Sequence, residues 1–149
     1  MTETLLVSLL LFGHFWTPSK AASPPSKSLC DHDERLMRRS HTKVVRLKAT
    51  ELKKRVVVCK APALPGNFDG RGIVIITVLV GPDGTVRCLD ALSGHPLLRQ
   101  SALVAVRQWT FNPIKINGKL AAMTGLLPVV VSWDSAEAEK QCEGLEPVK

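Results

Sequence analysis

The residues from Gly72 to Ser93 constrain the fold more than any other part of the sequence. The run GIVIITVLV is unbroken, apolar and rich in β-branched residues, which is typical of a strand with both faces covered. The tetrapeptide GPDG at Gly81–Gly84 predicts a tight turn, and TVRCLDALS then predicts the antiparallel partner strand. Neither face of this second strand is cleanly apolar, so the pattern leaves its core face open.

A sharply bounded helix is predicted directly after this hairpin. Gly94 allows a turn, either Ser93 or His95 caps the helix, and Pro96 suits the first helical position. Pro113 then forbids continuation. One stripe of residues at spacings of three and four predicts an amphipathic helix of about 14 residues that covers one sheet face. The stripe consists of Leu98, Ala102, Ala105, Val106 and Trp109.

A second hairpin and a final strand complete the predicted sheet. INGK at Ile116–Lys119 is a hairpin turn signal, and GLLPVVVSW at Gly125–Trp133 predicts the last strand. Pro128 cannot donate to a ladder, which indicates an edge strand or a bulge. Upstream, Lys43–Leu47 suits a short strand and Thr50 suits the N-cap of a helix over ELKKRVV. We expect an α+β fold, with a small antiparallel sheet of about three strands and helices packed on one face.

The start of the chain is expected to be an export segment. Leu5–Trp16 form an apolar block of 12 residues, whereas a bilayer span needs about 20. The block suits a secretory signal with small residues at Ser19–Ala21, although Glu3 and His14 depart from that pattern. We expect residues 1–21 to be a signal peptide or a short N-terminal anchor, and a buried helix of a cytosolic protein is the alternative.

Charge divides the remaining 128 residues of the 149-residue chain. Residues 22–60 hold eleven Lys/Arg against four Asp/Glu, whereas residues 134–149 hold five acids against two lysines. We predict a basic linker at 22–49 with a helical turn near Asp33–Arg39, one domain at 50–133, and an acidic tail. The basic segment lacks the interleaved aromatics on which single-stranded nucleic acid stacks, so no nucleic-acid partner is expected.

The four cysteines are Cys30, Cys59, Cys88 and Cys142, and their wide spacing excludes CxxC and zinc-knuckle motifs. An even number in an exported protein suggests disulfides, for which three pairings are open. Because Cys30 and Cys142 lie in segments of opposite charge, we prefer Cys30 with Cys142 and Cys59 with Cys88. Four free thiols are the alternative in a cytosolic chain.

No enzymatic signature emerges from the polar residues. Asp90, Ser93 and His95 lie close together, but a catalytic triad also needs an oxyanion hole and a substrate cleft, and helix capping explains the spacing. CDHDE at Cys30–Glu34, with His41 nearby, matches no ordered metal site. We expect no catalytic residue, no metal and no cofactor. The open last strand is instead suited to accept an extended peptide.

Together these motifs resemble the C-terminal domain of the TonB energy-transducer family over about Thr50–Trp133. PALP at Pro62–Pro65 is similar to the family's Pro-x-Tyr-Pro, with Leu64 in place of tyrosine. GIVIITVLVGPDGTV is similar to the family's Gly-x-Val strand and Asp-Gly turn. SGHPLLRQSALVAVRQWTFNP is similar to its Ser-Gly-His-Pro-Leu-Leu segment, its helix and its Trp-x-Phe-x-Pro end, and NGK precedes a β run.

The resemblance implies a periplasmic fold like the C-terminal domains of TonB and TolA. It also implies that the domain binds the TonB box of outer-membrane receptors by strand addition, in energy-coupled transport. Carried over, Leu64 and Pro65 provide a second contact, and the last strand provides the main one. The implied residues of that strand are Leu126, Leu127, Pro128, Val129, Val130, Val131, Ser132 and Trp133.

The N-terminal part departs from the family. A transducer carries a Ser-x-x-x-His pair in a membrane-spanning helix, whereas Ser8 and His14 lie six apart in a block too short to span. The linker of about 20 residues reaches at most ~70 Å. We therefore expect a non-enzymatic domain that binds a receptor peptide or envelope protein, with membrane contact only if the N-terminal segment stays uncleaved. The alternatives are a homodimeric envelope domain and a basic cell-wall or nucleic-acid binder through residues 22–60.

Overall fold

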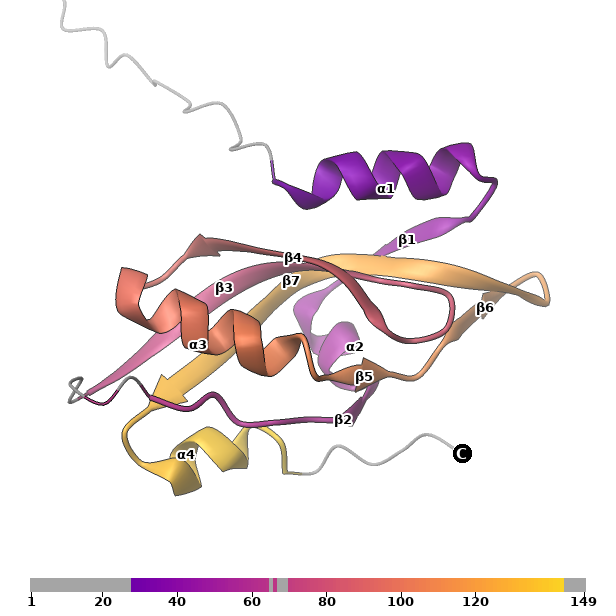
Figure 1. The fold of residues 1–149 in the computed structure, drawn as a ribbon. Helices are drawn as coiled ribbons and strands as arrows, with labels where there is room; N and C mark the ends of the chain where they lie inside the picture. The colour runs from indigo at the N-terminus through magenta and orange to yellow at the C-terminus, as the bar shows by residue number, and fades with distance from the viewer. Residues whose placement is uncertain (1–27, 65, 67–69, 144–149) are drawn as a thin grey trace, which may run out of the picture.

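The computed structural model describes residues 28–64, 66 and 70–143 (Figure 1). The predicted export segment at 1–21 and the predicted contact residue Pro65 lie outside this part of the chain. The elements are α1 (Cys30–Arg39), β1 (Val44–Leu47), α2 (Ala49–Lys53), β2 (Val56–Val58), β3 (Arg71–Val80), β4 (Val86–Ser93), α3 (Pro96–Val106), β5 (Thr110–Phe111), β6 (Ile114–Ile116), β7 (Lys119–Ser132) and α4 (Ser135–Lys140).

The main sheet has five strands, not about three as predicted. Its order is β1-β7-β3-β4, and β6 pairs with the start of β7. β3 and β7 are antiparallel over their whole common length without a register shift. The sheet is larger than expected because β1 pairs in parallel with Ala122–Gly125 and β6 folds back on β7. β2 and β5 form a separate two-stranded sheet.

Both predicted hairpin turns are confirmed. Gly84 ends the β3–β4 turn at φ 81°, and its N–H donates to the Gly81 carbonyl over 3.0 Å. Gly118, with φ 75°, closes the β6–β7 turn. In the first turn, slight burial acts to raise the pKa of Asp83. Hydrogen bonds from the Thr85 hydroxyl and N–H, with the Arg87 guanidinium 2.7 Å away, outweigh this and lower the pKa.

The main hydrophobic core lies between one face of the sheet and α3. β3 contributes Val74, Ile76, Val78 and Val80 to this face, all fully buried. The predicted helix is confirmed, although α3 has 11 residues instead of about 14. Its whole apolar stripe is buried: Leu98, Ala102, Ala105, Val106 and Trp109 are each at most 3% exposed. The predicted cap is also confirmed, because the His95 ring accepts the Leu97 N–H.

The opposite face of the sheet is covered in part by α1, so the helices do not all pack on one face as predicted (Figure 1). A smaller cluster forms there, in which Cys30 of α1 packs with Val44, Leu79 and Ala122. The predicted helical turn near Asp33–Arg39 is a ten-residue helix. Acids in its first turn and arginines in its last favour this helix, since both complement the helix dipole.

Two further predictions between β1 and β3 were wrong in detail. Thr50 is not the N-cap of α2 but lies inside its first turn. The helix begins at Ala49, and Lys48 is the N-cap residue. The Glu51 carboxylate instead accepts the Lys48 N–H at 3.3 Å. The predicted helix over ELKKRVV also ends early, because Val56–Val58 form β2 and pair with β5. β-Branched valines favour such a strand over a helical turn.

Candidate peptide-docking edge

The side of β7 that faces away from β3 is the candidate docking site, and we refer to it as the outer edge. The Ala122 N–H donates to the Lys43 carbonyl, and the Val130 N–H donates to the Gln141 side chain, so both point outward. Backbone groups of a strand alternate between its two neighbours, and β7 runs without a register shift. The even-numbered residues of β7 therefore direct their backbone groups to the outer edge.

Proline at position 128 fits this orientation. Pro128 is even-numbered, so the N–H that it lacks would have pointed outward and not toward β3. The ladder between β3 and β7 consequently loses no hydrogen bond at this residue. Of the two explanations that the sequence left open, an edge or a bulge, the structure supports an edge.

The outer edge is only partly free of the chain's own structure. β1 pairs with it over Ala122–Gly125, so the start of the predicted last strand lies between two strands. Beyond Gly125, no strand in the described residues pairs with this edge. At Val130, however, the Gln141 side chain accepts the backbone N–H and donates to the carbonyl, each over 2.9 Å. This amide replaces the groups that a neighbouring strand would supply.

Gln141 is held in place by α4, the short helix that follows β7. Asp134 caps this helix by accepting the Ala136 N–H over 2.9 Å. Glu137 accepts a hydrogen bond from the Ser132 hydroxyl and pairs with Arg71 of β3 at 2.7 Å. Together with the burial of Ala138, these contacts fix α4 against β7.

The predicted binding residues of the last strand fall on two faces. Leu127, Val129 and Val131 are fully buried in the main core, so their side chains cannot contact a docked peptide. The side chains on the other face differ in exposure. Leu126 is 45% exposed, Pro128 and Val130 are half-buried, and Ser132 is buried under Glu137. Trp133 follows the strand and is 72% exposed.

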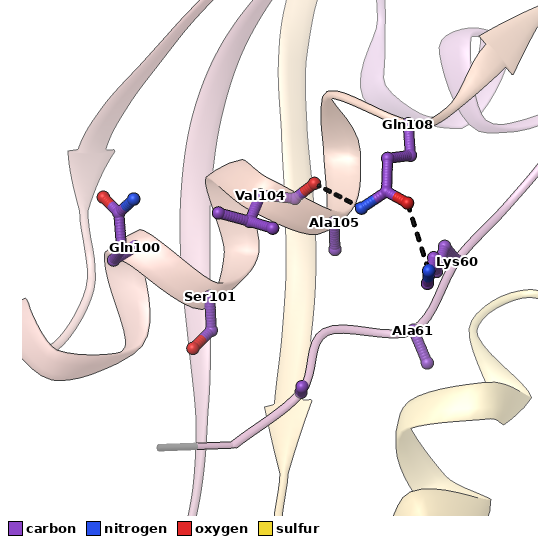
Figure 2. A pocket seen from close by; sticks show the side chains of 8 residues that line it. Lys60, Ala61, Gln100, Ser101, Val104, Ala105 and Gln108 are labelled. Carbon is purple, nitrogen blue, oxygen red and sulfur yellow. Dashed lines mark hydrogen bonds between the residues drawn. The ribbon is translucent and has the colours of Figure 1, made fainter.

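Leu64 is the other described residue of the predicted site. It packs against the main core. The chain before it runs between α3 and α4 (Figure 2). There the Lys60 carbonyl accepts the Trp109 indole N–H at 2.9 Å. A shallow pocket of about 320 Å³ lies beside it, lined by Ala61, Ser101 and Val104 among others.

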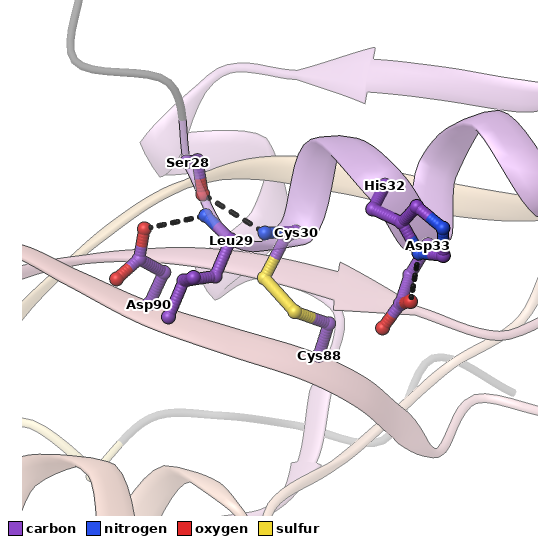
Figure 3. Close-up of a disulfide and its surroundings, with 7 residues drawn as sticks. All are labelled: Ser28, Leu29, Cys30, His32, Asp33, Cys88 and Asp90. Atoms are coloured by element: carbon purple, nitrogen blue, oxygen red, sulfur yellow. Dashed lines mark hydrogen bonds and ion pairs between the residues drawn. A yellow bond between two sulfur atoms is a disulfide. The ribbon is translucent and has the colours of Figure 1, made fainter.

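The four cysteines form two disulfides, but the preferred pairing was wrong. Cys30 pairs with Cys88 and Cys59 pairs with Cys142. Figure 3 shows Cys30 at the start of α1, over the Cys88 side chain of β4. Charge did not predict the pairing because α1 lies across the opposite sheet face from α3, whereas α4, in the described part of the acidic tail, packs against β7. Within the described residues no cysteine is free.

The polar clusters considered for chemistry have structural partners. Asp90 accepts the Leu29 N–H at 2.9 Å (Figure 3), and His95 caps α3. Cys30 is committed to a disulfide, so the CDHDE segment cannot supply a thiolate ligand. In the described part of the chain, no group of three or more His, Cys, Asp or Glu side chains is placed to hold a metal ion.

Sequence reasoning missed α4 and the role of Gln141. A signal for the helix is present, because Asp134 begins the motif DSAE, in which an N-cap acid precedes helix-favouring residues. Nothing in the sequence indicates that a glutamine at the end of this helix bonds to the backbone of β7. That contact depends on tertiary packing.

The part of the chain that forms the β3–β4 hairpin, α3 and most of β7 is similar to a known protein family. Residues 69–130 match the family of the Gram-negative bacterial TonB protein C-terminal. This TonB C-terminal segment runs from the start of β3 into β7 and is shorter than the resemblance suggested. No curated protein matches the chain. The segment does not include α1, β1, α2, β2 or α4, so β1 and α4, which contact the outer edge in the described part of the chain, lie outside the match.

Proposed function

We propose that the chain is a periplasmic TonB-like domain that binds an extended segment of an outer-membrane receptor or another envelope protein. Binding occurs by strand addition along the outer edge of β7 and forms part of energy-coupled transport. The observation that carries this proposal is that, among the described residues, no strand pairs with the outer edge of β7 beyond Gly125. The match of residues 69–130 to the TonB C-terminal family supports the same role.

The chemistry of this edge favours an extended peptide over a small molecule. Strand addition draws its affinity from main-chain hydrogen bonds and its specificity from alternate side chains. On the open face, alternate side chains of the peptide would lie beside Leu126, which is 45% exposed, and Pro128. A shallow pocket of about 400 Å³ adjoins Leu126 at the end of β1 and includes Lys48. Its lysine suits an acidic side chain of the peptide.

The disulfides and the matched family support a binding role in the envelope. Disulfides persist in oxidising compartments, of which the bacterial periplasm is one. The matched family is one of transducing and binding domains, not of enzymes. None of the helices in the described part of the chain is both long enough and apolar enough to cross a bilayer.

A calorimetric titration tests this proposal. The full chain is titrated with synthetic peptides from the N-terminal segments of outer-membrane receptors, in oxidising and in reducing buffer. We expect saturable binding that Leu126→Ala weakens about fivefold, since about 1 kcal/mol of apolar contact is lost. Val104→Ala is the matched control, because Val104 is 51% exposed on α3, away from the edge. A lack of binding in both buffers, or equal weakening by both variants, contradicts the proposal.

A further inference from the structure

The segments that cover the outer edge are each tied to the domain by a disulfide. The Cys30–Cys88 bond holds α1, which leads directly into β1. The Cys59–Cys142 bond holds the residue that follows Gln141. Both covering segments lie outside the matched TonB C-terminal segment. Each disulfide therefore restrains a segment that covers the edge at which strand addition is proposed.

The contact of Gln141 is in direct competition with strand addition. A peptide strand beside β7 needs the outward N–H and carbonyl of Val130, since Pro128 offers no N–H of its own. Gln141 occupies both groups with a single side-chain amide. A peptide can therefore extend along the edge past Pro128 only after Gln141 has left.

α4 depends on its attachments for its position. It is six residues long, which is far below the length at which an isolated helix is stable in water. Its anchors are the Glu137 contacts with Ser132 and Arg71, the buried Ala138, and the Cys59–Cys142 bond. The Glu137–Arg71 pair is partly exposed to solvent and contributes little. The disulfide is the strongest of these restraints.

We propose that α4 is an autoinhibitory segment over the outer edge of β7, and that reduction of the Cys59–Cys142 disulfide releases it. This inference rests on the proposed function, because it concerns access to the same edge. In the oxidised chain Gln141 blocks the Val130 backbone. In the reduced chain the segment after Asp134 is tethered only by weak contacts, and a peptide strand can displace it.

The release requires a dithiol reductant such as a periplasmic dithiol protein. One of its thiolates attacks a sulfur of the Cys59–Cys142 bond, forms a mixed disulfide and expels the other sulfur as a thiolate. The second thiol of the reductant then attacks the mixed disulfide. Two electrons pass to this chain, which takes up two protons to form two cysteine thiols, and the reductant becomes a disulfide.

Exposure distinguishes the two disulfides as targets. Cys59 and Cys142 are both partly exposed, so a reductant has access to either sulfur. In the other bond Cys88 is partly exposed, but Cys30 is only 2% exposed and belongs to the cluster beneath α1, so a reductant has access at one end alone. Attack on a disulfide requires access to a sulfur, so the Cys59–Cys142 bond is expected to open first.

Amide hydrogen exchange tests this mechanism without a ligand. The double variant Cys59→Ser, Cys142→Ser is compared with the oxidised chain by NMR. We expect the Val130 amide to exchange about tenfold faster or more in the variant, because its side-chain acceptor is lost when α4 opens. The Val129 and Val131 amides, which face β3, keep their protection. Equal exchange at Val130 in both proteins overturns the proposal.

A second variant separates this inference from the proposed function. Gln141→Ala keeps both disulfides and removes the edge contact, together with the hydrogen bond that the Gln141 amide donates to the Ala138 carbonyl. Lys140→Ala is its control at an exposed neighbouring residue. We expect receptor-derived peptides to bind Gln141→Ala and the double cysteine variant more tightly than the oxidised chain, by about fivefold or more. Equal binding by all of these proteins refutes autoinhibition and leaves the docking edge intact. Fast exchange at Val130 without any peptide binding refutes the docking function and leaves the release of α4 intact.

Discussion

The assignment of β7 side chains to two faces predicts that neighbouring leucines differ sharply in their contribution to stability. Leu127 is fully buried in the main core, where it lies opposite Ile76 in the ladder. Leu126 precedes it, points to the other face and is 45% exposed. The same substitution, leucine to alanine, can therefore be made at two adjacent positions of one strand.

The expected magnitudes follow from these exposures. Leu127→Ala leaves a cavity between the sheet and α3 and is expected to lower the free energy of unfolding by about 3 kcal/mol. Leu126→Ala removes a side chain that is already about half in water and is expected to cost at most about 1 kcal/mol. For a guanidinium m-value of about 3 kcal/mol/M, the Leu127→Ala midpoint falls by about 1 M.

Guanidinium unfolding of the oxidised proteins measures this difference. Trp109 is a suitable fluorescent probe because it is 2% exposed in the folded chain and its indole N–H donates to the Lys60 carbonyl. Equal destabilisation by the two substitutions would refute the face assignment. A larger effect at Leu126 would mean that the register of β7 is shifted by one residue, which would also reverse the outer-edge argument.

Two further predictions concern the β3–β4 turn. Gly84→Ala is expected to lower the free energy of unfolding by at least about 2 kcal/mol, since Gly84 has φ 81° and a Cβ there would collide with the Phe111 carbonyl oxygen. Gly118→Ala is the control, because Gly118 has φ 75° and open space around a Cβ, and it is expected to lower the free energy of unfolding by about 1 kcal/mol. Equal losses of stability in thermal unfolding would contradict the collision between a Cβ at position 84 and the Phe111 carbonyl. Asp83→Asn is expected to be less stable than the wild type at neutral pH by at most about 1 kcal/mol. Because the folded-state pKa of Asp83 is lowered, this difference is fully present above the unfolded pKa near 4 and disappears as the pH falls through the folded pKa. A constant difference between pH 7 and pH 2 would show that the Asp83 charge is not responsible.

The elements that the sequence predicted well are those with local signals. The β3–β4 hairpin follows from its Asp-Gly turn between β-branched runs, and α3 follows from Pro96, its apolar stripe and the stop at Pro113. Each of these signals lies within a few residues of the structure that it specifies. The match to the TonB C-terminal family falls on this same part of the chain.

The features that the sequence did not predict depend on distant contacts. The short strand at Lys43–Leu47 was predicted, but not that this strand, β1, joins the sheet by pairing with β7 more than 70 residues later. The disulfide pairing depends on which sheet face α1 covers, and charge does not determine that face. Gln141 belongs to a polar tail, and only the packing of α4 places its amide where it bonds to the Val130 N–H and carbonyl, as a neighbouring strand would.

The location of the docked peptide tests the account most directly. A receptor-derived peptide with a nitroxide at one end is added to the isotope-labelled double variant Cys59→Ser, Cys142→Ser, and paramagnetic broadening of each backbone amide is measured. We predict the strongest broadening along β7 from Leu126 to Ser132 and in the adjoining end of β1. Strongest broadening along β4, which ends the sheet on its other side, would contradict it.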